Sequence, residues 1–330
     1  MRDPLSTAMR ASHVLAGAFV LAALVFAAVA ARSGDVFYLR LATEALMFGG
    51  LALSVDLLLG FTGLLSLGQA LYFGLGAYVS ALVLIATASF WLALGAALIA
   101  GVLAGCIGGV IANRVRGVYF ALITFGMAQV IAKIVYNTRA LGASDGLIGV
   151  PVLDINLGFH TVSSASPAGF FLFVLVFVLM LYAVIAYLLE TPFGRLLVAI
   201  RANEQRVAFL GYSTVRLRFA SFVLAAAVAS VCGALYPVLR GFVAPELLFF
   251  STSGDALIVL VIGGVGTLVG PLYGSVMLVM LKSVIGSWTE HHLIFIGLIF
   301  MATVIALPGG IMGLARHWVI RFIAPKEGVS

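Results

Sequence analysis

The sequence is poor in charge: only 9% of its 330 residues are Asp, Glu, Lys or Arg, whereas 63% are hydrophobic. A soluble domain typically has about a quarter of its residues charged, so this composition is typical of an integral membrane protein. Lysine is scarce, and none of Lys133, Lys282 and Lys326 follows a glycine. A Walker A motif is therefore absent, and the chain does not hydrolyse ATP by a P-loop mechanism.

Cysteine and histidine are also few. Cys106 and Cys232 both lie inside apolar runs, and the five histidines form no HExxH pattern. The residues thus give no basis for a disulfide, a metal site or a cofactor, and no nucleophile is spaced with a base. The 18 basic residues, which give a net charge of +6, are scattered between apolar runs. This pattern is typical of membrane-flanking charge and excludes a nucleic-acid-binding stripe.

Apolar runs of about 20 residues, long enough to cross the hydrocarbon core as helices, fill most of the chain. The sequence predicts an all-α polytopic bundle of about ten transmembrane segments. They are expected near 14–31, 41–59, 61–88, 90–112, 118–136, 168–189, 219–241, 256–270, 271–287 and 291–307. The eighth is short, as a broken or re-entrant segment would be. Residues 1–31 also resemble a signal peptide, but the length of the first run favours a retained helix.

The loops between these segments differ in basic content. The positive-inside rule predicts a cytoplasmic location for the loops rich in Arg and Lys, and for both chain termini. These loops are 1–13, the loop with Arg114 and Arg116, residues 190–218 and the tail after 307. Segments 137–167 and 241–255 have no excess of basic residues and are expected outside.

Residues 190–218 form a polar island with five arginines: Arg195, Arg201, Arg206, Arg216 and Arg218. Thr191-Pro192 is typical of a helix start, and Gly211 of a helix end. Leu196, Ile200, Val207 and Leu210 recur on one face between them, whereas Arg201 and Gln205 face away. We expect one amphipathic helix here. Docking on a protein partner, binding to anionic membrane lipid and setting the topology all remain open from these residues.

Two glycine-rich segments, 56–84 and 255–281, carry the other candidate site. Glycine permits both close helix packing and breaks in a membrane helix. Broken helices at corresponding positions of two inverted halves point to a transport path, and tight packing is the alternative. The candidate path residues are Asp56, Ser66, Gly68, Gln69, Gly263, Gly264 and Gly266.

Three charges lie within predicted membrane segments. Glu44 and Lys282 are expected near an interface, where their side chains extend to water. Asp56 ends its helix close to Gly60, so it is interpreted either as a buried polar cap or as a functional group.

Five stretches, taken together, resemble a known family. They are "GLLSLGQALYFGLGAYVSALVL", "GVYFALITFGMAQV", "SDGLIGVP", "TPFGRLLVAIRANEQRVAFLGY" and "VIGGVGTLVGPLYG". Their order is similar to that in the LivM-type permeases of branched-chain amino acid ABC importers, and the resemblance spans roughly residues 40–315. It implies a permease domain over 41–330, with coupling segment 190–218, after an N-terminal helix and external loop in 1–40.

The resemblance also implies partners: a homologous second permease subunit, two ATP-binding cassette subunits and a periplasmic solute-binding protein, in a bacterial inner membrane. Residues 202–211, "ANEQRVAFLG", resemble the coupling loop that docks on the ATPase. This places Arg201, Glu204 and Gly211, with Arg195 just before them, on the coupling element. The chain would then be a non-catalytic permease whose two halves rock around Ser66–Gln69 and Gly263–Gly266.

Two residues depart from the family pattern. The family usually has histidine where this chain has Gln69, and commonly asparagine where it has Asp56. Relatives import urea, short amides or aromatic acids, so leucine, isoleucine and valine are the leading solutes among several. A secondary transporter coupled to ions through Asp56, and a scaffold with no solute path, are the alternatives from other classes.

Overall fold

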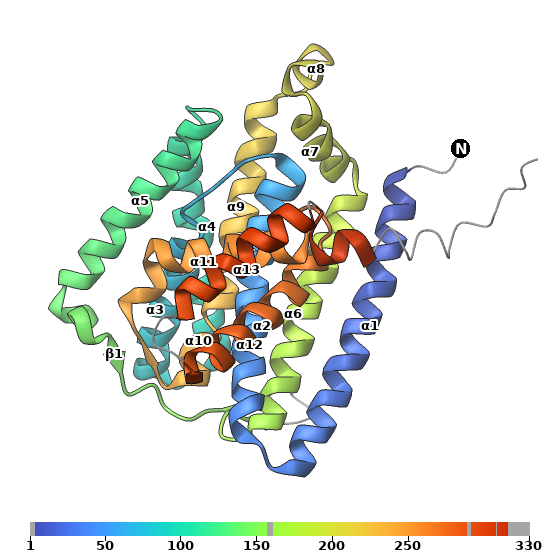
Figure 1. The fold of residues 1–330 in the computed structure, drawn as a ribbon. Coiled ribbons are helices and arrows are strands. Elements are labelled where there is room, and N and C mark those ends of the chain that lie inside the picture. Colours follow the sequence, from blue (N-terminus) through green and yellow to red (C-terminus); the bar gives the residue numbers. More distant parts are fainter. Residues whose placement is uncertain (1–3, 157–160, 289–291, 308, 316–330) are drawn as a thin grey trace, which may run out of the picture.

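The computed structural model describes residues 4–156, 161–288, 292–307 and 309–315. Over these ranges the chain is an almost entirely helical bundle (Figure 1), which confirms the predicted all-α class. Nine helices, or pairs of consecutive helices, are long and apolar enough to cross a membrane within the described residues. They are α1 (Pro4–Ser33), α2 (Val36–Asp56) with the π-helical turn η1 (Leu57–Thr62), α3 (Gln69–Thr87), α4 (Phe90–Ala112), α5 (Val118–Asn137), α6 (Pro167–Glu190), α9 (Thr214–Gly233) with α10 (Tyr236–Arg240), α12 (Gly270–Trp288), and a last span over Leu293–Ala315 that contains most of α13 (His292–Ala306).

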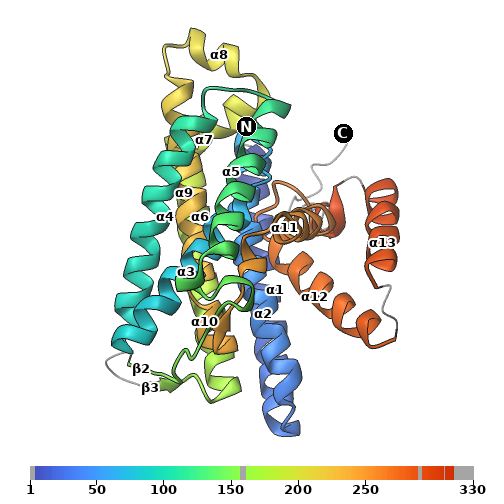
Figure 2. The ribbon, with the colours of Figure 1, turned by 90° about the vertical axis from the view of Figure 1, so that its left-hand side faces the viewer.

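The remaining elements are short. Two helices, α7 (Pro192–Ala202) and α8 (Glu204–Phe209), lie at one end of the bundle, and small strands lie towards the other (Figure 2). The strands form two antiparallel pairs: β1 (Leu147–Ile148) with β4 (Phe242–Val243), and β2 (Asp154–Asn156) with β3 (Thr161–Ser163). Three 3₁₀ turns accompany them: η2 (Arg139–Leu141), η3 (Ala143–Asp145) and η4 (Pro245–Leu248). The β1–β4 pair joins the two segments that the sequence predicts to lie outside.

Small residues determine how closely the central helices pack. A Cβ on Gly101 of α4 would lie 2.4 Å from the Ser230 Cβ of α9, and one on Gly105 would lie 2.8 Å from the Ala226 Cβ. The Ser230 hydroxyl donates to the carbonyl of Ala97, 2.6 Å away. Because lipid gives helices no hydrophobic reason to associate, such backbone approach and interhelical hydrogen bonds stabilise the bundle.

Helix α11 (Phe250–Gly263) differs from the expected eighth crossing over 256–270. It has 14 residues, which at 1.5 Å per residue is about 21 Å, shorter than the hydrocarbon core of about 30 Å. It lies across the long helices rather than along them (Figures 1 and 2). Residues 264–269 are not helical, and α12 begins at Gly270. The described residues therefore contain nine candidate crossings and this short segment. The number of crossings and the arrangement in two inverted halves stay predictions.

The expected boundaries around the third crossing were also wrong. The second helix begins at Val36 rather than near 41 and continues through η1 to Thr62. Residues 63–68 are not helical, so the third crossing starts at Gln69 rather than at 61. Gly63 ends η1 with a φ of +78°, a left-handed conformation that glycine adopts readily. The glycine-rich segment therefore contains a true helix break.

Helices α1 and α13 form the periphery. Along both of them large apolar side chains are exposed, among them Leu21, Val29, Leu293, Met301 and Ile305. α2, in contrast, is buried along most of its length. A helix buried within the protein is positioned to line a path, whereas α1 and α13 are positioned to face lipid or another chain.

Candidate coupling and translocation site

The two helix breaks meet at the carboxylate of Asp56. Its Oδ1 accepts the backbone N–H of Gly266 at 2.7 Å, and its Oδ2 accepts the backbone N–H of Leu268 at 3.1 Å. Asp56 ends α2 and is fully buried, while the two amides lie in the linker between α11 and α12. A buried carboxylate is stable only when its oxygens are hydrogen-bonded. Asp56 therefore joins both breaks and takes the role of a buried polar cap.

Gly60 permits this junction. A Cβ at this position would lie 2.0 Å from the Asp56 Oδ1 and 2.7 Å from the Gly266 nitrogen. No side chain fits between these groups without displacing backbone. Gly60 lies inside η1, where the hydrogen-bonding pattern of the helix changes and carbonyls near its end lack intrahelical partners.

Arg201 brings the polar island into contact with the junction. Its Nη1 donates to the carbonyl oxygen of Gly60, although the two residues are 141 positions apart. A Cβ on Gly63 would lie 3.2 Å from the Arg201 Cγ, and one on Gly266 would lie 3.0 Å from its Nη1. A cation at the C-terminal end of a helix is favourable because the free carbonyls carry partial negative charge. One side chain of α7 thus contacts both breaks.

The island itself is not the single helix that was expected. It divides at Asn203, whose side-chain oxygen accepts the Arg206 N–H and caps α8. The helix start at Thr191-Pro192 is confirmed. The break has a local reason, since asparagine favours N-cap positions over helix interiors.

The break changes which side chains face inward. Ile200 and Val207 are buried as expected, but Leu210 is 74% exposed. Arg201 is exposed, as expected of a residue that faces away, but its Nη1 reaches back to the Gly60 carbonyl, a contact that the periodicity did not indicate. Gly211 follows α8 by one intervening residue, with a φ of +86°.

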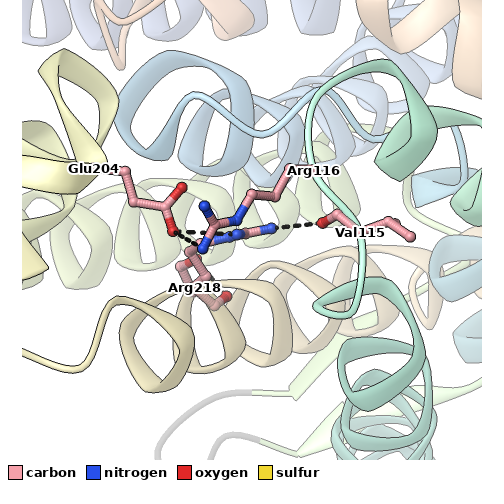
Figure 3. A network of polar contacts seen from close by, with 5 residues as sticks. Val115, Arg116, Glu204 and Arg218 are labelled. Carbon is pink, nitrogen blue, oxygen red and sulfur yellow. Dashed lines mark hydrogen bonds and ion pairs between the residues drawn. The ribbon is translucent and has the colours of Figure 1, made fainter.

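A cluster around Glu204 holds α8 in place (Figure 3). The Glu204 Oε1 lies 3.3 Å from the Arg218 Nη1 and 3.5 Å from the Arg116 Nη2. Arg218, only 2% exposed, also donates from Nη2 to the carbonyl of Val115 at 3.0 Å. The cluster therefore ties α8 to α9 and to the loop between α4 and α5. Arg195, by contrast, is exposed.

The predicted residues Ser66 and Gly68 lie in the loop before α3, and Gln69 is the first residue of α3. The Ala70 N–H in the first turn of α3 donates to the Ser253 hydroxyl of α11 at 3.0 Å, so this loop lies beside α11. Gln69 is completely buried, and neither polar atom of its amide has a hydrogen-bond partner among the described residues. A buried amide without a partner is costly, which distinguishes this side chain from the apolar residues around it.

The predicted residues Gly263 and Gly264 lie in the tight connection between α11 and α12. A Cβ on Gly263 would lie 2.0 Å from the carbonyl oxygen of Gly270, and Gly264 has a φ of +119°. Gly263 therefore has no room for a Cβ, and Gly264 has a backbone conformation that residues with side chains rarely adopt. Gly266, two residues further along, is the one that contacts Asp56.

Glu44 and Lys282, which were expected near an interface, each have an ion-pair partner that the sequence did not indicate. The Glu44 Oε2 lies 2.5 Å from the Arg240 Nη2, and the Lys282 Nζ lies 2.5 Å from the Asp255 Oδ2. The first pair joins α2 to α10 across 196 positions, and the second joins the consecutive helices α11 and α12 across 27 positions. Neither spacing falls within one helix, so no helical periodicity reveals the pairs. The described residues include no group of three or more His, Cys, Asp or Glu that could hold a metal.

Sequence reasoning missed the partners of the predicted residues: Gly60, Leu268, Arg116, Val115 and Arg240. Gly60, Leu268 and Val115 contribute a backbone group or the space for one. Such roles do not depend on the type of side chain, so a sequence pattern does not reveal them. The glycine at 60 was visible as part of a glycine-rich stretch, but its contact with Gly266 was not.

Comparison with known proteins gives a consistent picture. Residues 37–304 match the family described as the permease component of branched-chain amino acid transport systems. The chain is 27% identical over 298 residues to the high-affinity branched-chain amino acid transport system permease protein LivM of Salmonella typhimurium, covering 84% of this chain and 70% of that protein. The Escherichia coli LivM gives the same values. A probable LivM of Methanocaldococcus jannaschii is 27% identical over 172 residues, half of this chain. No solved structure matches.

Proposed function

Because the chain belongs to the permease component family of branched-chain amino acid transport systems, we propose that it is a membrane-spanning subunit of an ATP-driven ABC importer. Its partners are a homologous second permease, two ATP-binding subunits and a periplasmic solute-binding protein. The chain lies in the bacterial inner membrane with both termini in the cytoplasm. Its solute is an amino acid such as leucine, isoleucine or valine, as the names of its relatives suggest.

The observation that carries the proposal is the contact between Arg201 and Gly60. In this mechanism the ATP-binding subunits move α7 and α8 when they bind and hydrolyse ATP. Arg201 transmits that movement to η1, and Asp56 carries it on to the linker between α11 and α12. Two discrete arrangements of such a packed junction would open the path alternately to each side.

The end of α8 is suited to receive an ATP-binding subunit. Phe209 is 89% exposed and Leu210 is 74% exposed, beside the exposed guanidinium of Arg206. Aromatic and arginine side chains are enriched at the centres of protein interfaces. A polybasic lipid anchor has fewer uncharged polar residues than this segment, so docking on a protein is the use that we propose. Figure 2 also supports the topology, since α1 begins at the same end of the bundle as α8.

The ion-coupled alternative receives less support. Both oxygens of Asp56 already accept backbone N–H groups, which is the arrangement of a cap rather than of a group that exchanges ions. The unpartnered amide of Gln69, beside α11, is consistent with the proposed path through Ser66–Gln69 and Gly266.

Two variants separate docking from transmission in the reconstituted importer. Replacing Phe209 and Leu210 by alanine is expected to remove the ATP-binding subunits from a pull-down in mild detergent. Arg201→Met is expected to keep them but to lower uptake per ATP hydrolysed by about tenfold, as expected for loss of a hydrogen bond from a charged donor. Arg139→Met, an exposed arginine at the opposite end, is the matched control. A wild-type chain that purifies alone, in detergent that preserves a known importer, would contradict the proposal.

A further inference from the structure

A cavity of about 330 Å³ opens between α2, α11 and α12. Its polar wall consists of Glu44, Asp255 and Lys282, and Arg240 lies behind Glu44 as its ion-pair partner. The rest of the wall is apolar and is formed by Leu41, Phe48, Val259, Leu278 and Val279, with Ser283 at its edge. Small-molecule sites have this character, a mainly apolar concavity with a few placed polar groups.

The position of the cavity along α2 separates it from the coupling junction. Glu44 precedes Asp56 by 12 residues in one helix, a distance of about 18 Å along the axis. In the proposed topology α2 begins outside the membrane and ends at the cytoplasmic side. The cavity therefore lies in the outer half, where a solute released by a binding protein would arrive.

We propose that this cavity receives a zwitterionic α-amino acid with an apolar side chain. The inference rests on the proposed function and adds the place in this chain at which that solute binds. The solute ammonium pairs with the carboxylate of Asp255 or Glu44, and its carboxylate pairs with the Lys282 ammonium. The solute side chain lies against the apolar wall formed with Phe48 and Val279.

Charge balance selects this class over the others. Glu44 and Asp255 contribute two negative charges, and Arg240 and Lys282 contribute two positive charges, so the site is neutral. A zwitterion that enters between Asp255 and Lys282 replaces one ion pair with two and leaves no charge unpaired. An anionic aromatic acid would leave one negative charge without a partner in an apolar setting, which is costly. Urea and short amides have no charged groups that would use the two pairs.

The size of the cavity agrees with the same class. Ligand pockets span about 300–1,000 Å³, and this one lies at the small end of that range. Its apolar wall is larger than urea or acetamide needs. An aliphatic amino acid fills both parts of the site.

The test uses the complete importer in proteoliposomes, with its binding protein, and measures ATP-driven uptake of leucine, acetamide and benzoate. Lys282→Met keeps most of the side-chain length but removes the charge. It is expected to lower leucine uptake by about tenfold to a hundredfold, the effect of losing a hydrogen bond to a charged group. Lys133→Met is the matched control, because Lys133 is exposed on α5 and lies over the ring of Tyr136. Uptake in the control is expected to equal wild type.

A charge exchange separates binding from a merely structural ion pair. Asp255→Lys combined with Lys282→Asp keeps a pair in place and is expected to restore the thermal stability of the complex. The positions of the two charges relative to the apolar wall are reversed, so leucine uptake is expected to stay low. Full recovery of leucine uptake in the exchanged variant would overturn the inference and leave the pair a structural one.

Val279→Phe tests the apolar wall without touching a charge. The larger ring reduces the space for the solute side chain, so leucine uptake is expected to fall more than alanine uptake. Equal effects on both would count against the cavity.

The outcomes also separate this inference from the proposed function. If Lys282→Met leaves leucine uptake at the wild-type level, the inference about the cavity is overturned and the proposed importer is retained. The same conclusion follows if the wild-type complex takes up acetamide or benzoate but not leucine. A wild-type complex that imports none of the three and has no ATPase partner overturns both.

Discussion

Two sites along α2 place charge inside the apolar body and neutralise it in different ways. They are the inner junction at Asp56, where α2 ends, and the outer cavity around Glu44 and Lys282, both named after the proposed topology. Asp56 at the inner junction is paired with backbone amides of Gly266 and Leu268. Glu44 and Lys282 at the outer cavity are paired with other side chains, Arg240 and Asp255. Backbone amides cannot move without moving the chain, so the inner junction is part of the fold. A side-chain pair can open around a solute that carries both charges, so the outer cavity can bind and release.

The largest expected effect tests this distinction directly. Asp56→Leu leaves two buried N–H groups without acceptors, each costing about 1–3 kcal/mol. We expect little folded protein, measured as the fraction that stays monodisperse in detergent after heating. Replacing both Asp255 and Lys282 by leucine is expected to leave stability nearly unchanged, since exchanging a whole ion pair for apolar residues is often neutral.

Leucine uptake by the double variant is measured alongside its stability. The double variant should fold but import little leucine, because its cavity has lost the groups that receive the solute. If the double variant loses more stability than Asp56→Leu, the outer pair is the structural one and the comparison fails.

An intermediate effect is expected at Gly60. Gly60→Ala places a Cβ against the Asp56 carboxylate and the Gly266 nitrogen. Such overpacking typically costs about 1–3 kcal/mol. Gly95→Ala is the matched control, since a Cβ at Gly95 of α4 meets nothing within 4 Å and alanine favours a helix. The measurement is the midpoint of thermal unfolding, and equal midpoints for both variants would argue against a rigid junction.

The sequence located the residues of the junction at Asp56 but indicated few of their contacts, and it predicted no binding site at Glu44 and Lys282. The glycine-rich segments predicted both helix breaks, whereas the position of Asp56 at the end of its helix left a buried polar cap and a functional group equally open. The partners of Asp56 are backbone amides 210 and 212 positions away, and a backbone N–H is the same for almost every residue type. No side-chain pattern could therefore have revealed them.

Helical periodicity did not indicate the contact of Arg201, because it describes the direction of the Cβ and not the reach of a long side chain. The guanidinium lies several bonds further on and extends back to the Gly60 carbonyl. Asn203 also divides the segment, so the periodicity of one continuous helix did not apply. The fold class, in contrast, depends on long apolar runs, which composition alone reveals.

The smallest expected effect concerns Glu44. In Glu44→Gln the pair with Arg240 is lost, but the Arg240 side chain is 45% exposed, so stability should fall by no more than about 1 kcal/mol. High salt should reduce the difference from wild type, because exposed pairs are screened. Asp154→Asn, an exposed carboxylate on β2, is the control. A loss of stability as large as that of Asp56→Leu would show that the pair of Glu44 is a structural one, like the contacts of Asp56.

In the proposed importer, the exposed apolar faces of α1 and α13 would contact either lipid or a neighbouring subunit. In a bilayer, lipid tails solvate such faces as well as another protein does, so their hydrophobicity does not favour association. A partner must be selected by shape, through small residues that let backbones approach. Lipids compete with protein for the same faces, so the assembly of the proposed importer depends on the lipid composition of the bilayer.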